Sequence, residues 1–114
     1  MISLTNATID CADARRLAEF WCAALDYRVE DESSEWSYLV DAKGAGVPLF
    51  LQVVPEAKSV KNRVHLDYAS TDAQAEAERL SALGATIVSQ TTQESGPFFV
   101  MADPEGNEFC IAST

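Results

Sequence analysis

The residues best suited to chemistry stand on two segments in the second half of the chain. The single histidine, His65, and Asp67 alternate with apolar residues, and Glu108 and Cys110 do the same near the end. Because successive side chains of a β-strand point to opposite faces, each pair should lie opposite its apolar neighbours. An imidazole, two carboxylates and a thiol gathered on one face could hold a divalent metal ion or move a proton.

Two segments in the first half alternate in the same way. Their apolar positions should form a core, which leaves these side chains on the other face: Asn6, Thr8, Asp10, Phe50 and Gln52. Polar groups that converge from separate strands are typical of a binding site. Further aromatic residues lie on the middle strands, where alternation alone does not decide which face they occupy: Trp36, Tyr38, Phe98 and Phe99.

Hydrophobic periodicity predicts two helices, at about 13–26 and 72–83. The first has an apolar stripe that includes Phe20 and Trp21. The second should begin at Thr71 as its N-cap and end at Gly84. Strands are expected at about 4–10, 27–29, 36–41, 47–54, 63–69, 85–89, 98–102 and 108–112. The acidic stretch 30–35 should be a loop.

The order of these elements repeats once, as two βαβββ units. Asp13 and Asp72 precede the two helices and lie 59 residues apart, and Asn6 and His65 each lie seven residues before them. Such self-similarity indicates an internal repeat. We therefore expect one pseudo-symmetric domain over 1–114, with module one at about 1–55, a linker at about 55–62 and module two at about 63–114.

The composition excludes several classes of partner. The 114 residues carry a formal net charge of −10, which argues against nucleic acid and anionic membrane surfaces. The three cysteines form no CxxC pair, so neither a disulfide framework nor a structural zinc site is indicated. With no signal peptide and no apolar run of spanning length, the expected location is the cytoplasm.

Three segments together resemble the vicinal oxygen chelate (VOC) superfamily, which includes glyoxalase I, bleomycin-resistance proteins and extradiol dioxygenases. They are CADARRLAEFWCAALD at 11–26, VHLDY at 64–68 and DPEGNEFCI at 103–111. The resemblance implies an α+β fold in which two βαβββ modules form a curled, mixed eight-stranded sheet. It also implies a cup for a small-molecule ligand and a homodimer.

The resemblance further implies a divalent metal held by four residues, which map to Asn6, Gln52, His65 and Glu108. His65 and Glu108 are strong ligands, Gln52 is a weak one, and Asn6 departs from the usual His or Gln. Zinc, nickel, manganese and iron all stay open as the ion. The alternative for His65 is a hydrogen-bonded pocket histidine paired with Glu108 or Asp67.

Three functions follow from these features. The first is a metal-assisted lyase or isomerase of the glyoxalase type, with His65 and Glu108 as catalytic residues. The second is an acidic binding protein that sequesters a cationic or aromatic compound, as in antibiotic resistance. The third is a metal-free enzyme. Since Asp10, Asp67 and Glu108 are all expected on the cup face, a neutral or cationic ligand should be preferred.

Overall fold

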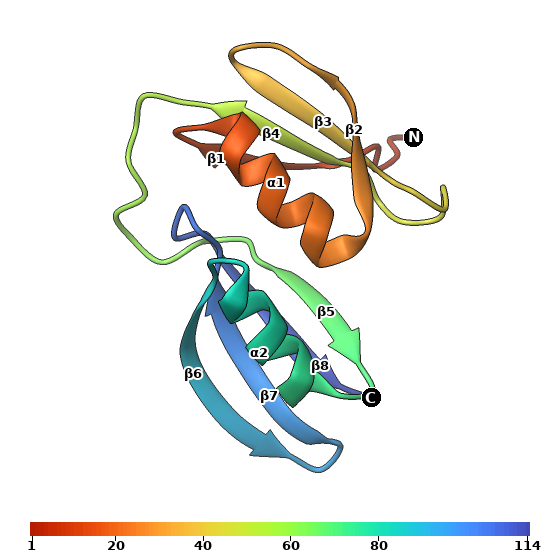
Figure 1. Cartoon of the computed structure of the whole chain (residues 1–114), viewed down its shortest axis with the longest axis vertical. Helices are drawn as coiled ribbons and strands as arrows, with labels where there is room; N and C mark the ends of the chain where they lie inside the picture. The colour runs from red at the N-terminus through yellow and green to blue at the C-terminus, as the bar shows by residue number, and fades with distance from the viewer. The chain divides into compact units, whose positions relative to one another are not determined.

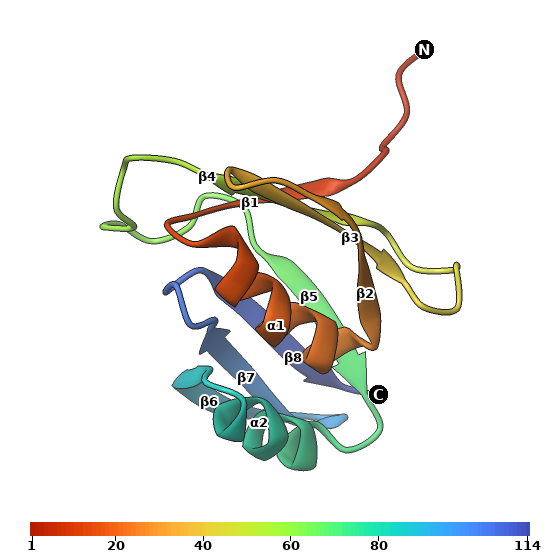
Figure 2. The ribbon, with the colours of Figure 1, turned by 45° about the horizontal axis from the view of Figure 1, so that its top comes forward.

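The computed structural model describes all residues, 1–114, which divide into two compact units, Met1–Ala57 and Lys58–Thr114. Each unit contains one helix and one four-stranded sheet, and in Figures 1 and 2 each helix lies across one face of its own sheet. Neither helix is long and apolar enough to cross a membrane. That the whole chain acts as one domain stays a prediction.

The first unit is a complete βαβββ module. Its elements are β1 (Ala7–Cys11), α1 (Ala14–Leu25), β2 (Tyr27–Glu32), β3 (Trp36–Asp41) and β4 (Leu49–Val53). The strand order is β1-β4-β3-β2, with β1 parallel to β4 and the other neighbours antiparallel. The sheet is therefore mixed, because α1 carries the chain across before β4 returns beside β1.

The second unit repeats this plan. Its elements are β5 (Leu66–Ser70), α2 (Ala73–Ala82), β6 (Thr86–Gln93), β7 (Gly96–Ala102) and β8 (Glu108–Ser113). The order is β5-β8-β7-β6, with β5 parallel to β8 and the other pairs antiparallel. The α+β class and the two βαβββ modules are thus confirmed, with the eight strands hydrogen-bonded as two sheets of four.

Helix α1 begins and ends where the sequence predicts. The Asp13 carboxylate accepts a hydrogen bond from the backbone N–H of Arg16 at 3.1 Å, which satisfies one of the free donors of the first turn. Asp26 closes the helix in the left-handed conformation, with φ of 57°. Phe20 and Trp21 of the predicted apolar stripe are buried, and they meet edge to face with ring centroids 5.0 Å apart.

Helix α2 begins one residue later than predicted. Its N-cap is Asp72 rather than Thr71, and the Asp72 carboxylate accepts from the N–H of Ala75 at 3.0 Å. A carboxylate reaches the N–H three residues ahead, whereas Thr71 lies too far back to cap this turn. The end of the helix is as predicted, because Gly84 follows it with φ of +118°, a conformation that glycine adopts without strain.

Several strand boundaries differ from the expectation. β2 continues through Glu32, so part of the acidic stretch is an edge strand and not a loop. β6 likewise runs to Gln93. Both are the last strands of their sheets, and both carry a register shift against their neighbour, between Val29 and Asp31 and between Ile87 and Ser89. Polar side chains suit an edge strand, which is why composition alone suggested a loop.

The start of β5 also corrects an expectation. Val64 was expected on the core side of a strand beginning at residue 63, but β5 begins at Leu66 and Val64 is 77% exposed. Leu66 and Tyr68 keep their expected side, since both are more buried than Asp67 between them. Alternation is a property of the paired strand, so it predicts nothing for residues that precede it.

Candidate functional site

The helix-free face of the first sheet collects the side chains that alternation predicted, together with two aromatic residues. Thr8 lies opposite Phe50 and Asp10 opposite Gln52, where β1 pairs with β4. On the other side of β4, the partners of Gln52 and Phe50 in β3 are Trp36 and Tyr38. We call these residues the aromatic face: Thr8, Asp10, Trp36, Tyr38, Phe50 and Gln52.

Its orientation follows from burial. The residues that alternate with the aromatic face are buried on the side that α1 covers, and they include Ser37, Leu39 and Leu51, all 0% exposed. The three rings, in contrast, are half-buried. Phe50 stacks on Trp36 with ring centroids 5.5 Å apart and an interplanar angle of 22°, and it meets Tyr38 at 6.3 Å. Sequence reasoning left Trp36 and Tyr38 unassigned, and the strand register supplies the missing signal.

Asn6 lies just before β1 and is tied into this region. Its side-chain amide donates to the hydroxyl of Thr8 at 3.2 Å. Gln52 is held by the pairing of β4 with both β1 and β3. The metal ligands implied by the family resemblance come from both units. Asn6 and Gln52 lie in the first unit, and His65 and Glu108 lie in the second. That set stays a prediction.

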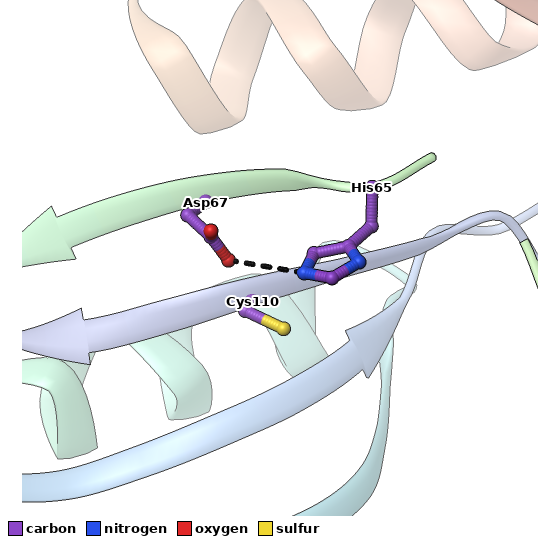
Figure 3. Close-up of side chains that lie close together, drawn as sticks. All are labelled: His65, Asp67 and Cys110. Carbon is purple, nitrogen blue, oxygen red and sulfur yellow. Dashed lines mark ion pairs between the residues drawn. The ribbon is translucent and has the colours of Figure 1, made fainter. Parts of the chain in front are cut away.

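In the second unit, three candidate side chains lie close together. His65 precedes β5, Asp67 lies on β5, and Cys110 is the residue of β8 that pairs with Asp67 (Figure 3). His65 Nε2 lies 3.4 Å from Asp67 Oδ1, and one donor atom from each of the three residues lies within 4.8 Å of the others. We call these residues the His65 cluster: His65, Asp67 and Cys110. Of the two partners expected for His65, the structure shows Asp67.

Cys110 is not set up as a nucleophile. Burial raises the pKa of its thiol, and the negative charge of Asp67 and a hydrogen bond to that carboxylate raise it further. The thiol is therefore protonated at neutral pH, whereas a reactive cysteine needs a cationic environment. A bound cation would reverse this balance, because its charge would outweigh that of the carboxylate.

Glu108 is held by cationic and backbone donors. Its carboxylate accepts from the backbone N–H of Asn62 at 2.9 Å and from Lys61 Nζ at 3.0 Å, and Lys58 Nζ lies 3.9 Å away. The Asn62 hydrogen bond, followed by the interaction with Lys61, lowers the pKa of Glu108. An ionised, engaged carboxylate is a poor proton donor and would have to exchange partners to bind a metal. Sequence analysis missed these contacts because Lys58 and Lys61 lie on the expected linker.

The donors of the His65 cluster fit a borderline divalent ion. A neutral imidazole, a carboxylate and a thiolate suit zinc and related metals, whereas manganese and magnesium prefer oxygen ligands. If a metal binds here, His65, Asp67 and Cys110 would hold it, and it would supply Lewis-acid polarisation of a ligand oxygen.

The fold and these faces define a protein of VOC architecture, with one βαβββ unit per half of the chain. More specifically, the chain belongs to the glyoxalase-like domain family, whose model matches residues 6–112. The resemblance that the sequence suggested is therefore confirmed. No curated protein sequence matches the chain.

Solved structures share the fold at low identity. A fosfomycin resistance protein FosX variant from Listeria monocytogenes, in complex with Mn(II) and a dihydroxypropylphosphonic acid, matches with a TM-score of 0.80 at 17% identity, covering 100% of this chain and 93% of that one. A bleomycin-binding protein from Streptomyces verticillus, bound to copper(II)-bleomycin, matches with a TM-score of 0.67 at 15% identity, covering 100% and 99%. An Agrobacterium tumefaciens protein, ATC0852, matches with a TM-score of 0.80 at 19% identity, covering 99% and 98%. At these identities the likeness establishes the fold alone.

Proposed function

We propose that the protein binds a small molecule with a planar, neutral or cationic group, and that the aromatic face receives it. The observation that carries this proposal is the stack of Trp36 on Phe50 beside Gln52 on the face that α1 leaves uncovered. Aromatic pairs offer further rings an apolar surface of defined geometry. The bleomycin-binding relative, whose name states its ligand, supports a binding role for this fold.

Charge decides between ligands of equal size. The chain carries a formal net charge of −10, and the aromatic face contains Asp10 and no basic residue. An anion moved toward a carboxylate at about 4 Å meets a repulsion of roughly 4 kcal/mol at an effective dielectric of about 20. A cation gains from the same field, and it also gains from the electron-rich faces of the rings.

The test compares three ligands that share a naphthylmethyl group and carry a positive, a neutral or a negative substituent: naphthylmethylammonium, naphthylmethanol and naphthylacetate. Calorimetric titration of the metal-free full chain should give the tightest binding for the ammonium and the weakest for the carboxylate. Trp36→Ala should weaken binding of the ammonium about tenfold, which corresponds to about 1.4 kcal/mol. Preference for the anion, or an unchanged affinity in Trp36→Ala, would overturn the proposal.

A matched pair of variants separates local from overall charge. Asp10→Asn removes a carboxylate from the aromatic face, and Glu19→Gln removes an exposed one from α1. Each removes one negative charge from the net charge of −10, so the two variants have the same net charge. Asp10→Asn should reduce the discrimination between ammonium and carboxylate ligands, whereas Glu19→Gln should leave it unchanged. Equal effects would mean that ligand choice follows the total charge of the protein and not the aromatic face.

Two earlier predictions stay open as extensions of this function. Lyase or isomerase catalysis would use His65 and Glu108, and the ion pairs of Glu108 with Lys58 and Lys61 make it the weaker of the two candidates. A homodimer is expected because open sheet edges need cover. Light scattering at micromolar concentration tests it, and a mass near 12.4 kDa would contradict it.

A further inference from the structure

We propose that His65, Asp67 and Cys110 form a binding site for a zinc-like divalent metal ion, with one nitrogen, one oxygen and one sulfur ligand. The site lies wholly within the second unit, and it shares no residue with the aromatic face. It shares only His65 with the four-residue set that the family resemblance implies.

The sheet fixes the relative positions of the three ligands. Asp67 and Cys110 are direct neighbours across the parallel pair of β5 and β8, which places their side chains on the same face. His65 lies two residues before Asp67, and its imidazole points to the same side, over the sulfur of Cys110 (Figure 3). Because β8 lies inside the sheet between β5 and β7, its cysteine is held by pairing on both sides.

The distances need only a small adjustment. In a tetrahedral zinc site with bonds of about 2.0 to 2.3 Å, neighbouring ligand atoms lie about 3.3 to 3.8 Å apart. His65 Nε2 and Asp67 Oδ1 are already 3.4 Å apart, and all three donor atoms lie within 4.8 Å of one another. The required shift is about 1 Å. Side-chain rotation at His65 and Asp67 can supply it, since their side chains are 42% and 65% exposed.

The charges of the cluster also match a divalent ion. As metal ligands, an imidazole, a carboxylate and a thiolate together carry two negative charges, which one M²⁺ ion neutralises. Burial, and then the adjacent Asp67 carboxylate, raise the pKa of the Cys110 thiol in the absence of a metal. Metal binding would replace the proton of the thiol, as it does wherever a cysteine is a ligand.

Three protein ligands leave one tetrahedral position open, which is the arrangement of metal sites that bind water or a substrate. Glu108 is not needed in this site, because Lys61 and Asn62 already hold its carboxylate. This separates the present proposal from the set implied by the resemblance, in which Glu108 is a principal ligand.

Cobalt(II) tests the site through its spectrum, without any assay of activity. Metal-free, untagged full chain titrated with Co²⁺ should develop visible bands of a four-coordinate ion and a near-ultraviolet band of thiolate-to-cobalt charge transfer. Stoichiometric Zn²⁺ should abolish both. Cys110→Ser should lose the charge-transfer band, whereas Cys22→Ser, a matched loss of one thiol on α1, should keep it.

Two further variants keep the test decisive if Cys110→Ser fails to fold. Asp67→Asn alters an exposed side chain and should weaken Co²⁺ binding at least tenfold while the charge-transfer band remains at saturation. Glu108→Gln should retain the band with near wild-type affinity. The proposal is overturned if wild-type protein gives no charge-transfer band. It is equally overturned if Asp67→Asn binds unchanged, or if Glu108→Gln abolishes binding.

Discussion

The two units share one order of elements but fill their cores from opposite layers. In the first unit the helix supplies the largest buried side chains, Phe20 and Trp21 on α1. In the second unit α2 contributes mainly small residues such as Ala77, and the sheet supplies Phe99 and Phe109. The same βαβββ frame therefore accepts either solution, provided that the space between helix and sheet is filled.

The helix-free faces differ in a second way. The first unit presents the aromatic face, and the second presents the His65 cluster beside the ion pairs of Glu108. Side chains on these faces do not fill the space under the helix, so the core does not constrain their type. Both units thus bury a core between helix and sheet, although with different side chains, and their helix-free faces carry different chemistry.

The largest expected effects come from the large aromatic residue of each core. Trp21→Ala and Phe99→Ala should each lower the free energy of unfolding by about 3–5 kcal/mol, because each leaves a cavity at a site no more than 2% exposed. Urea unfolding followed by circular dichroism measures both. Trp36→Ala, a tryptophan of the aromatic face, is the matched control and should cost clearly less than Trp21→Ala. Similar losses for these two tryptophans would contradict the division into core and uncovered faces.

A smaller and nearly equal effect should come from the two helix caps. Asp13→Ala and Asp72→Ala each remove a carboxylate that accepts one backbone N–H, at 3.1 Å and 3.0 Å. Each should lower the free energy of unfolding by about 1 kcal/mol. Thr71→Ala is the control, and it should have little effect because the cap is Asp72. If Thr71→Ala lowered the free energy of unfolding more than Asp72→Ala, Thr71 would be the N-cap, as the sequence pattern predicted.

The smallest effect should depend on pH, and it comes from the turn between β3 and β4 in the first unit. Asp41 accepts backbone hydrogen bonds from Lys43 at 2.9 Å, Gly46 at 2.7 Å and Ala45 at 3.2 Å, and these lower the pKa of its carboxyl. Because the folded-state pKa lies below the ordinary value of 3.8, the stabilisation is complete above that pH and is lost as the pH falls through the lowered pKa.

Asp41→Asn should therefore be less stable than the wild type at pH 7, and the difference should shrink as the pH falls below about 3.8. Urea unfolding of both proteins at pH 7 and at pH 3 measures the two differences. If the difference in the free energy of unfolding between the two proteins were larger at pH 3 than at pH 7, the predicted pH dependence would be wrong. The corresponding turn of the second unit joins β7 and β8, where the Asp103 carboxylate accepts the backbone N–H groups of Glu105 at 2.9 Å and Asn107 at 3.0 Å.

Sequence patterns predicted the fold well wherever a feature depends on residues that are close together in the chain. The stripe that includes Phe20 and Trp21 predicted α1, and Gly84 correctly marked the end of α2, which it follows with φ of +118°. Alternation also placed Asp67 and Cys110 on one face, as their pairing shows. These results depend on neighbours in the chain, which the sequence displays directly.

The misses depend on contacts between distant residues. The partners of Glu108 are Lys61 and Asn62, more than 40 residues away on a segment that composition described only as a linker. Trp36 joins the aromatic face through the register of β3 against β4, which no local pattern specifies. The sequence could thus predict which face of its strand each site residue occupies. The residues that each side chain contacts could be identified only from the pairing of the strands in the structure.

The bulges in β2 and β6 have a consequence for the newly made chain. Both strands end their sheets, and each carries its register shift at a corresponding place, Val29/Asp31 and Ile87/Ser89. A bulge twists an outer strand and interrupts its row of free backbone groups, so an incoming strand from another molecule finds no continuous template. The β2 and β6 edges are therefore protected against the addition of a strand during synthesis, when partly finished chains are most prone to aggregate.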